Sequence, residues 1–273
     1  MLFRSEESVF EWFASPAQAW RGQRMGRAMQ QLHRMANGHV VDGTFARSRA
    51  LDVRWLTRSV ADFNWPALAS PVVDVGGGIG ALEMALMKAY PETAPEFVIF
   101  DIPQTSANAK KVRGPCPWPP EACRSPGTLQ IWASQPAAAQ ERVSFVAGDF
   151  LAPTLPETNI PCGRPTYLIR HVLHDWTDDQ VVSILRNVRS AMLTSDREEG
   201  APAPTLLVCE MLLQATSSRF VHTTSMQLLA LNNGATRTEG EMLALVVRAG
   251  FRVVQVHAMR AVDSIIEAVP LVA

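Results

Sequence analysis

Two histidines, an arginine and an aspartate fall close together in the segment 170–176 (RHVLHDW). This segment follows an apolar run at 166–169 that is typical of a β-strand, and Glu210 follows the next such run, at 205–209. Because parallel strands end at the same edge of a sheet, we expect His174 to lie near Glu210. An imidazole accepts a proton at neutral pH, and a neighbouring carboxylate fixes its tautomer and orientation. We therefore predict that His174 is a general base and that Glu210 orients it.

The spacing of His171 and His174 also raises the hypothesis of a metal site. No set of carboxylates or thiolates with the spacing of metal ligands accompanies the two histidines. We therefore predict that the site holds no metal, and we interpret Asp175 as a turn or helix-capping residue.

The segment 72–80 (VVDVGGGIG) combines an apolar run with four glycines, and an amphipathic pattern follows it. This order predicts a strand, a glycine turn and then a helix. Glycines allow the backbone to approach a bound molecule closely, and the N–H groups at the start of the helix point toward that molecule. We expect a nucleotide-like ligand at this turn.

Two kinds of nucleotide ligand fit the turn. With Gly76, Gly78 and Ala81, the sequence nominally meets the G-x-G-x-x-G/A pattern of dinucleotide-binding proteins. Asp74, two residues before the first glycine, instead favours a ligand that carries an ammonium group. Asp101, at the end of the second predicted strand, is placed to accept hydrogen bonds from ribose hydroxyls, which both kinds of ligand have. Asp101 therefore does not decide between them.

An acid and an aromatic residue, Asp149 and Phe150, follow the third predicted strand, at 143–146. A carboxylate at this level of the sheet can accept a hydrogen bond from the amino group of adenine. An aromatic ring beside it can pack on the base. We expect the two residues to hold the adenine of the ligand.

From Pro71 onward, predicted strands and helices alternate along the chain. We expect strands near 72–75, 97–100, 143–146, 166–169 and 205–209, and helices near 79–90, 104–112, 178–193, 222–231 and 239–249. This alternation predicts an α/β fold with a mostly parallel sheet and helices on both faces. Capping boxes at 177–180 (TDDQ) and 238–241 (TEGE) mark two helix starts. The runs 252–257 and 264–268 have no helix between them and predict an antiparallel pair at one edge.

Two segments fall outside this alternation. Residues 1–65 are predicted to form a helical N-terminal segment, because they show helical caps and a helical apolar stripe but no strand alternation. Residues 113–140 are predicted to be an inserted loop, since the segment begins with a proline-rich, aperiodic stretch. The rest of the region 66–273 is predicted to be the ligand-binding domain.

The composition excludes several classes of protein. The chain has 273 residues, 47% of them hydrophobic, which is enough for a sizeable core. A formal net charge of −1 gives no electrostatic reason to expect nucleic acid or an anionic membrane as partner. We expect no bilayer span and no signal peptide, because the sequence lacks apolar stretches of the required length. The four cysteines show no C-x-x-C spacing, and we predict a buried thiol at Cys209 and a reducing, cytoplasmic location.

Eight short motifs occur in order along the chain: VVDVGGGIG, FDIP, RVSFVAGDF, LIRHVLHDWTDDQVVSIL, LLVCEMLL, NGATRTEGEM, AGF and SIIEAVP. Each motif is weak alone, but this order and spacing are highly specific. From about Trp65 to Pro270, the chain resembles the S-adenosylmethionine-dependent O-methyltransferases of the caffeate and acetylserotonin type. That family also includes many fungal enzymes of secondary metabolism.

The resemblance implies a Rossmann-like class I methyltransferase fold with a seven-stranded sheet, and S-adenosyl-L-methionine as cofactor. The residues it implies for the cofactor are Asp74, Gly76 and Gly78 at the methionyl end, Asp101 and Ile102 at the ribose, Asp149 and Phe150 at the adenine, and Arg170 beside the cofactor. It also implies that His174, oriented by Glu210, withdraws the proton of a hydroxyl as the oxygen attacks the sulfonium methyl, without a metal.

We expect the acceptor to be a small aromatic molecule that carries a hydroxyl group. The residues expected to line its pocket are Met226, Gln227, Leu231 and Asn232. Such side chains describe a partly apolar pocket and do not identify one compound.

Two departures from the family pattern bear on activity. Thr236 stands where the family usually carries a second acid beside the base. The family's N-terminal dimerisation domain is expected to be reduced here to its final connecting helices, which leaves homodimer formation open. Two alternative hypotheses therefore remain: a catalytically impaired relative that only binds the cofactor, and an NAD-type oxidoreductase on a similar sheet.

Overall fold

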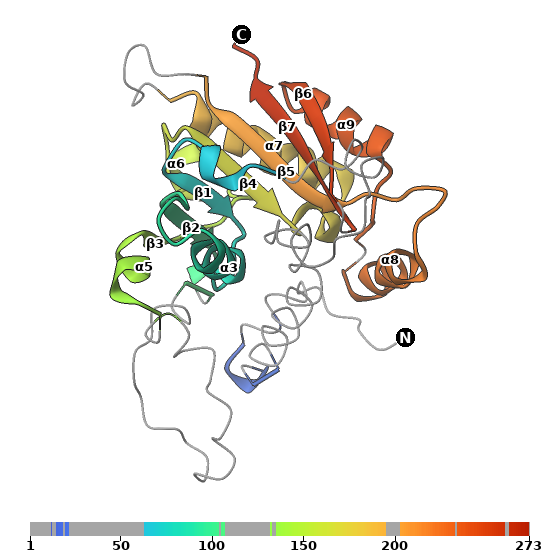
Figure 1. The fold of residues 1–273 in the computed structure, drawn as a ribbon. Helices are drawn as coiled ribbons and strands as arrows, with labels where there is room; N and C mark the ends of the chain where they lie inside the picture. Colours follow the sequence, from blue (N-terminus) through green and yellow to red (C-terminus); the bar gives the residue numbers. More distant parts are fainter. Residues whose placement is uncertain are drawn as a thin grey trace, which may run out of the picture.

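A computed structural model describes residues 12, 15–18, 20–21, 63–103, 105–106, 132, 135–194, 203–232, 234–259 and 262–272 (Figure 1). Most of the predicted helical segment 1–65 lies outside the described residues, apart from a few positions that include the short 3₁₀ helix η1 (Pro16–Gln18). The greater part of the predicted loop 113–140 and of the predicted helix near 104–112 also lies outside them.

The domain is built on one seven-stranded sheet. Its strands are β1 (Val72–Val75), β2 (Phe97–Asp101), β3 (Val143–Ala147), β4 (Thr166–Arg170), β5 (Thr205–Met211), β6 (Phe251–Ala258) and β7 (Asp263–Pro270). The spatial order is β3-β2-β1-β4-β5-β7-β6. The first five strands pair in parallel, and β7 pairs antiparallel with both β5 and β6. This confirms the predicted α/β fold and its antiparallel edge.

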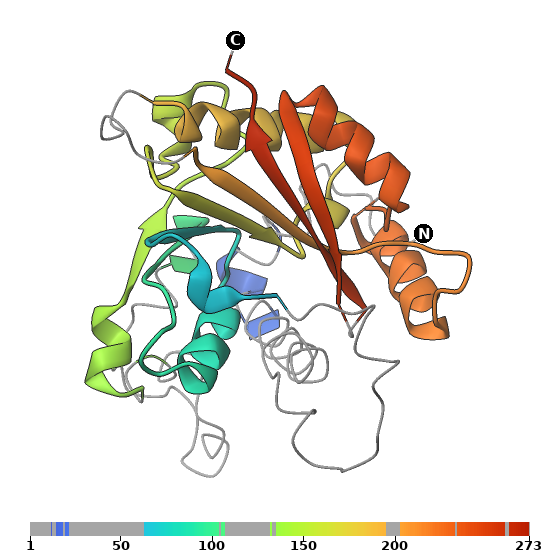
Figure 2. The same ribbon diagram turned by 45° about the horizontal axis from the view of Figure 1, so that its top comes forward.

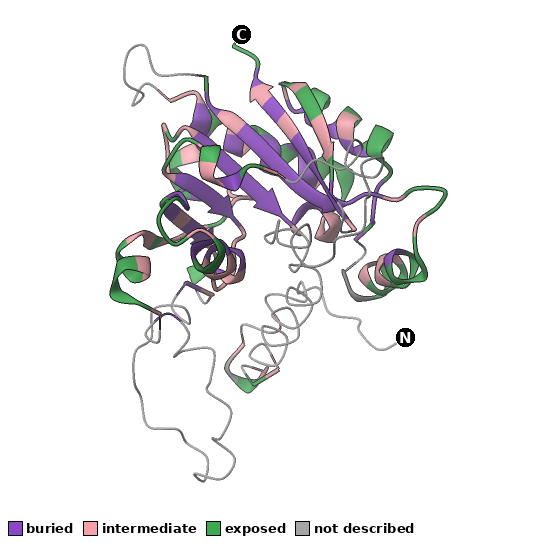
Figure 3. Cartoon of the chain, in the orientation of Figure 1, coloured by how far each residue is buried: buried purple, intermediate pink, exposed green. Residues whose placement is uncertain are grey.

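Helices cover both faces of the sheet (Figure 2). The α-helices are α3 (Ala81–Ala89), α5 (Ala137–Glu141), α6 (Leu155–Thr158), α7 (Asp178–Met192), α8 (Arg219–Asn232) and α9 (Glu239–Arg248). One core cluster joins α7 and α9 to one face of the sheet, and a second joins α3 to the other face. The central strands are buried on both faces, whereas α8 is largely exposed (Figure 3). Continuous apolar runs at the strands follow from this two-sided burial.

Capping interactions explain where α7 and α9 begin. Both begin with the predicted capping boxes, Thr177 with Gln180 and Thr238 with Glu241. The Thr238 backbone N–H donates to Glu241 Oε2 at 2.8 Å, and this bond, with the Thr238 hydroxyl, lowers the pKa of the Glu241 carboxyl. Capping satisfies N–H groups that have no partner inside the helix.

The structure also differs from the predicted elements. Residues 137–140 belong to α5 rather than to a loop, because a run of alanines has a high helix propensity. The short helix α6 and the 3₁₀ helices η4 (Trp65–Ala67) and η6 (Leu173–Asp175) are too short to leave a periodic signal. Trp65, at the predicted domain boundary, is fully buried in the α3-side core.

The parallel strands bring the predicted chemistry to one edge, which we call the carboxyl rim. The rim comprises the segments that follow β1 to β4 and the end of β5. Because β7 runs antiparallel to β5, its first residue, Asp263, pairs with Met211 and reaches the same rim. β1 and β4 are neighbours at the point where the strand order reverses, which is where ligands bind in sheets of this type.

Candidate active site

The carboxylate of Glu210 holds the turn that carries His174. Glu210 lies near the end of β5 and is 1% exposed. Its Oε1 accepts hydrogen bonds from the backbone N–H groups of Val172, at 3.0 Å, and Leu173, at 2.8 Å. Its Oε2 lies 2.6 Å from His174 Nδ1. The structure therefore brings together the predicted base and its predicted partner.

The charges around His174 favour its protonated form. Burial alone lowers the pKa of the imidazole, but the charge and hydrogen bond of Glu210, together with the charges of Asp175 and Asp263, outweigh burial and raise the pKa to about 9. Burial raises the pKa of the Glu210 carboxyl, yet His174 and the hydrogen bonds to the turn lower this pKa overall. Since Nδ1 faces Glu210, Nε2 is the nitrogen left for a substrate, and Asp175 Oδ1 lies 3.8 Å from it.

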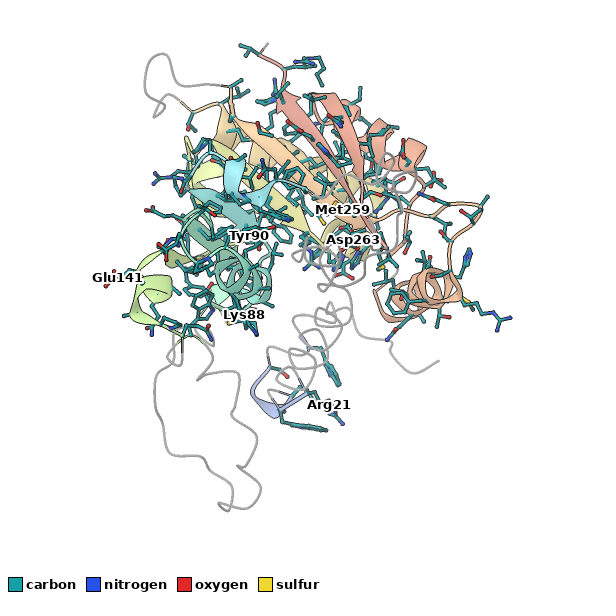
Figure 4. All side chains as sticks on the ribbon, viewed as in Figure 1. Arg21, Lys88, Tyr90, Glu141, Met259 and Asp263 are labelled. Carbon is teal, nitrogen blue, oxygen red and sulfur yellow. The ribbon has the colours of Figure 1, made fainter. Side chains whose placement is uncertain are left out.

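A second histidine–carboxylate pair lies beside the first. His171 Nε2 is 2.8 Å from Asp263 Oδ1, and Arg170 Nη2 is 3.5 Å from Asp263 Oδ2. The ring centroids of His171 and His174 are 5.8 Å apart. Asp263, labelled in Figure 4, is 1% exposed. We did not predict Asp263 as a site residue, because only the antiparallel return of β7 brings it to the rim.

The glycine turn is tied to β2 through Asp101. The backbone N–H of Gly78 donates to Asp101 Oδ2 at 2.9 Å, and that of Ile102 donates to Oδ1 at 2.8 Å. Burial raises the pKa of Asp101, although these two bonds and a hydrogen bond from the Thr105 side chain act against the rise. The carboxylate has more lone pairs than these three bonds use, which suits a hydroxyl of a ribose.

Two glycines of the turn leave space that another residue would fill. Gly76 and Gly78 have φ angles of +79° and +63°, a conformation that favours glycine. A Cβ on Gly76 would lie 2.5 Å from Val172 Cγ2, whereas one on Gly78 would meet nothing within 4 Å. The open side of Gly78 is therefore a place where a ligand can approach the backbone. The contact between Gly76 and Val172 also places the turn next to the His174 segment.

A pair of buried carboxyl groups lies behind the turn. Asp74 is 3% exposed and Glu83, in the first turn of α3, is fully buried. Asp74 Oδ1 and both Glu83 oxygens have no hydrogen-bond donor among the described residues. Burial, and next the charge of Glu83, raise the pKa of Asp74 well above its usual value; burial also raises the pKa of Glu83. A proton shared between the two carboxyls, or a cationic ligand group, would satisfy them.

The two predicted adenine residues have contacts of their own. Asp149 is exposed, and its Oδ1 accepts a hydrogen bond from the backbone N–H of Leu151 at 2.8 Å. Phe150 is half-buried and packs edge-to-face on Trp176, with ring centroids 5.6 Å apart. Both residues lie at the carboxyl rim, after β3, but the role predicted for them remains a prediction.

The predicted acceptor residues lie on α8. Met226 is 74% exposed and Gln227 is exposed, while the side chains of Leu231 and Asn232 lie outside the described residues. The backbone N–H of Ala235, just after α8, donates to the carbonyl of His174 at 2.9 Å. This bond places the end of α8 near the His174 turn. The acceptor role of these residues remains a prediction.

The described residues have further features that are not part of the predicted site. Two cavities of about 230 Å³ each open at the amino ends of the strands, on the opposite edge of the sheet. Cys209 is buried as predicted. Among the described residues we find no helix long and apolar enough to cross a membrane, and no cluster of three metal-ligating side chains.

The Asp74–Glu83 pair leads to a prediction about stability. Substitution Glu83→Gln replaces one carboxyl with an amide that donates a hydrogen bond to Asp74 without needing a proton. We expect the pKa of Asp74 to fall and the free protein to gain about 1 kcal/mol, or about 2–4 °C in melting temperature, at pH 8. The gain should shrink at pH 5, because a raised carboxyl pKa costs stability only as the pH rises above its usual value.

Thermal melts at both pH values test this expectation. Glu239→Gln is the matched control, because Glu239 also lies in the first turn of a helix but is exposed. A Glu83→Gln protein that melts at the same temperature as the parent, or below it, at pH 8 contradicts the shared-proton arrangement.

Comparison with known proteins identifies the domain. A model of the O-methyltransferase domain matches residues 51–115 and 130–252. O-methyltransferase tpcA of Aspergillus fumigatus is 32% identical over 234 residues, which cover 78% of this chain and 42% of that protein. The chain therefore spans less than half of this fungal relative.

Two solved structures share the fold. Human N-acetylserotonin methyltransferase in complex with SAM has a TM-score of 0.65 and 22% identity, covering 99% of this chain and 61% of that one. The O-methyltransferase NcsB1 from neocarzinostatin biosynthesis, in complex with S-adenosyl-L-homocysteine and 1,4-dihydroxy-2-naphthoic acid, has a TM-score of 0.64 and 23% identity, covering 98% and 63%. With the family match over more than half of the sequence, these findings show that the chain belongs to the O-methyltransferase domain family.

Proposed function

We propose that this chain transfers the methyl group of S-adenosylmethionine to a hydroxyl of a small aromatic acceptor, with His174 as general base. The observation that carries the proposal is the 2.6 Å contact between His174 Nδ1 and Glu210 Oε2. It leaves Nε2 of a tautomer-fixed imidazole at the same rim as the glycine turn. That arrangement suits removal of a proton from a hydroxyl beside a bound cofactor.

The residues behind the turn fit a cationic, ribose-containing cofactor. Asp74 is a buried carboxyl whose Oδ1 has no hydrogen-bond partner among the described residues, which suits the ammonium of a methionyl group. Asp101 holds the turn and keeps acceptor capacity for ribose hydroxyls. When bound, S-adenosylmethionine would supply a methyl group on a sulfonium, whose leaving group is a neutral thioether. The complexes of the two solved relatives with SAM or S-adenosyl-L-homocysteine support this choice of cofactor.

The acceptor class follows from the family and from the chemistry of the base. The aromatic dihydroxy acid in the NcsB1 structure supports a small aromatic hydroxyl compound as acceptor. His174 Nε2 would take the proton of the acceptor O–H as the acceptor oxygen takes up the methyl group that S-adenosylmethionine would supply, with the neutral thioether as leaving group. Glu210 stabilises the resulting imidazolium, and no other charge needs to leave the site.

A pKa of about 9 means that His174 rests mainly as an imidazolium at neutral pH. Only about 1% of the molecules then hold the free base at pH 7. Positive charge near the imidazole disfavours its protonation, so a bound sulfonium should lower this pKa. Binding of the cofactor would therefore help to generate the base form.

The role of His174 predicts a selective loss of turnover. His174→Ala should keep affinity for S-adenosyl-L-homocysteine, measured by calorimetry, and should lose about 10²–10⁴-fold in kcat with an aromatic hydroxyl acceptor. His257→Ala is the matched control. His257, on the edge strand β6, also forms a histidine–carboxylate pair, in which its Nε2 lies 2.9 Å from Glu267 Oε2. Equal activity of His174→Ala and the parent chain would remove His174 from the mechanism.

The pKa of His174 predicts a pH dependence. Because the base must be unprotonated, kcat/KM should rise with pH toward about 9, whereas kcat, which reports the bound complex, should level off at lower pH. The charged groups that face the imidazole are Glu210, Asp175 and Asp263. Initial rates measured between pH 6 and 10 test this expectation. This pH range spans both the ordinary histidine pKa of ~6.5 and the raised pKa of about 9. A kcat/KM that is flat over this range contradicts the base role.

A second candidate function is cofactor binding without transfer. Thr236 is 7% exposed, and its hydroxyl has no hydrogen-bond partner among the described residues, although the family resemblance leads us to expect an acid there. Binding of S-adenosyl-L-homocysteine without turnover on any phenol tested would favour this candidate. Binding of a dinucleotide instead would favour an oxidoreductase.

A further inference from the structure

Arg237 is a buried cation that contacts the turn on both sides of His174. The residue is 5% exposed. Its Nη1 donates a hydrogen bond to the carbonyl of Leu173 at 2.9 Å, and its Nη2 donates to the carbonyl of Trp176 at 2.7 Å. Its Nε donates to Asp178 Oδ1, at the start of α7, at 2.8 Å. The planar guanidinium thus connects η6 to the helix that follows it.

The backbone around Arg237 adds two more connections. The N–H of Ala235 donates to the carbonyl of His174 at 2.9 Å, and the N–H of Leu213 donates to the carbonyl of Arg237 at 2.8 Å. Leu213 is the second residue after β5, the strand that carries Glu210. The segment 235–237 therefore lies between the His174 turn and the chain that holds its partner.

The His174 turn is held by a negative charge at its backbone N–H groups and by a positive charge at its backbone carbonyls. On one side, the Glu210 carboxylate accepts from the N–H groups of Val172 and Leu173. On the other side, the Arg237 guanidinium donates to the carbonyls of Leu173 and Trp176. Charge-assisted bonds of this kind are stronger and more directional than neutral ones, and the fixed fork of arginine restricts their geometry. A short 3₁₀ turn has few bonds of its own to hold this orientation.

We propose that Arg237 is a positioning residue, which holds the His174 turn so that Nδ1 stays against Glu210 and Nε2 faces the substrate side. Arg237 touches neither the imidazole nor the reacting atoms in this account. Its effect on turnover rests on the proposed function, but its effect on the His174–Glu210 contact does not. The alternative is that Arg237 only anchors the start of α7. The test must distinguish this structural role from the positioning role.

The test compares Arg237→Lys and Arg237→Met with the parent chain. Lysine keeps the charge but cannot hold both carbonyls and Asp178 with one planar fork, and methionine removes the charge. The matched control is Arg248→Met, because Arg248 pairs with Asp179, the neighbour of Asp178, at an exposed site. The first readout is the pKa of His174 in the ligand-free protein, from NMR of labelled histidines. His174→Gln identifies its signal among the six histidines.

We expect the His174 pKa to fall by about one unit or more in Arg237→Met, because the imidazole moves away from Glu210, and by less in Arg237→Lys. The kcat should fall about 10–100-fold, since small displacements of a catalytic group have large effects. Affinity for S-adenosyl-L-homocysteine and the Arg248→Met protein should both match the parent. If Arg237→Met does not fold, Arg237→Lys carries the test.

An unchanged His174 pKa in both folded variants overturns the proposal, even if kcat falls. A fall in kcat together with cofactor affinity and melting temperature, at constant His174 pKa, assigns Arg237 the structural role alone. A shifted pKa in a protein whose parent transfers no methyl group would support the positioning role and refute the proposed function, so the two failures can be told apart.

Discussion

A single buried negative charge organises the part of this domain that carries His174. Glu210 is almost completely inaccessible, and an ionised carboxylate at such a depth must be paired and hydrogen-bonded. Its hydrogen-bond partners among the described residues come from one short turn, through two backbone N–H groups and an imidazole. Strand β5 and the segment between β4 and α7 are therefore fixed relative to each other. A movement of the turn would leave the carboxylate unsatisfied, which makes the position of His174 a consequence of burying Glu210.

The glycine turn is also anchored by a carboxylate that accepts hydrogen bonds from the backbone. Asp101 accepts from backbone N–H groups on both sides, one in the glycine turn and one at the end of β2. The parallel order of β2, β1, β4 and β5 places this second carboxylate on the same rim as Glu210. The packing of Val172 against Gly76 then joins the two halves. The rim therefore combines two acid-anchored loops, one suited to a ribose and the other to proton removal.

Much of this arrangement could be predicted from the sequence, because its signals are local. Apolar runs and capping boxes gave the parallel strands and the starts of α7 and α9, and side chains after strand ends gave His174 and Glu210. Asp263, Glu83 and Arg237 carry no such signal. Asp263 reaches the rim only because β7 returns antiparallel, and Glu83 looks like an ordinary acid in a first helical turn until α3 packs it behind Asp74. The contacts of Arg237 join segments about 60 residues apart, which no periodicity reveals.

The most direct test of the whole account is a crystal structure with S-adenosyl-L-homocysteine. We expect the ligand to lie over Gly76 and Gly78, with its ribose hydroxyls on Asp101, its ammonium near Asp74 and its sulfur on the same side of the rim as His174 Nε2. A ligand bound elsewhere, or one whose sulfur faces away from the imidazole, would contradict the central claim that these strand ends form one methyl-transfer site.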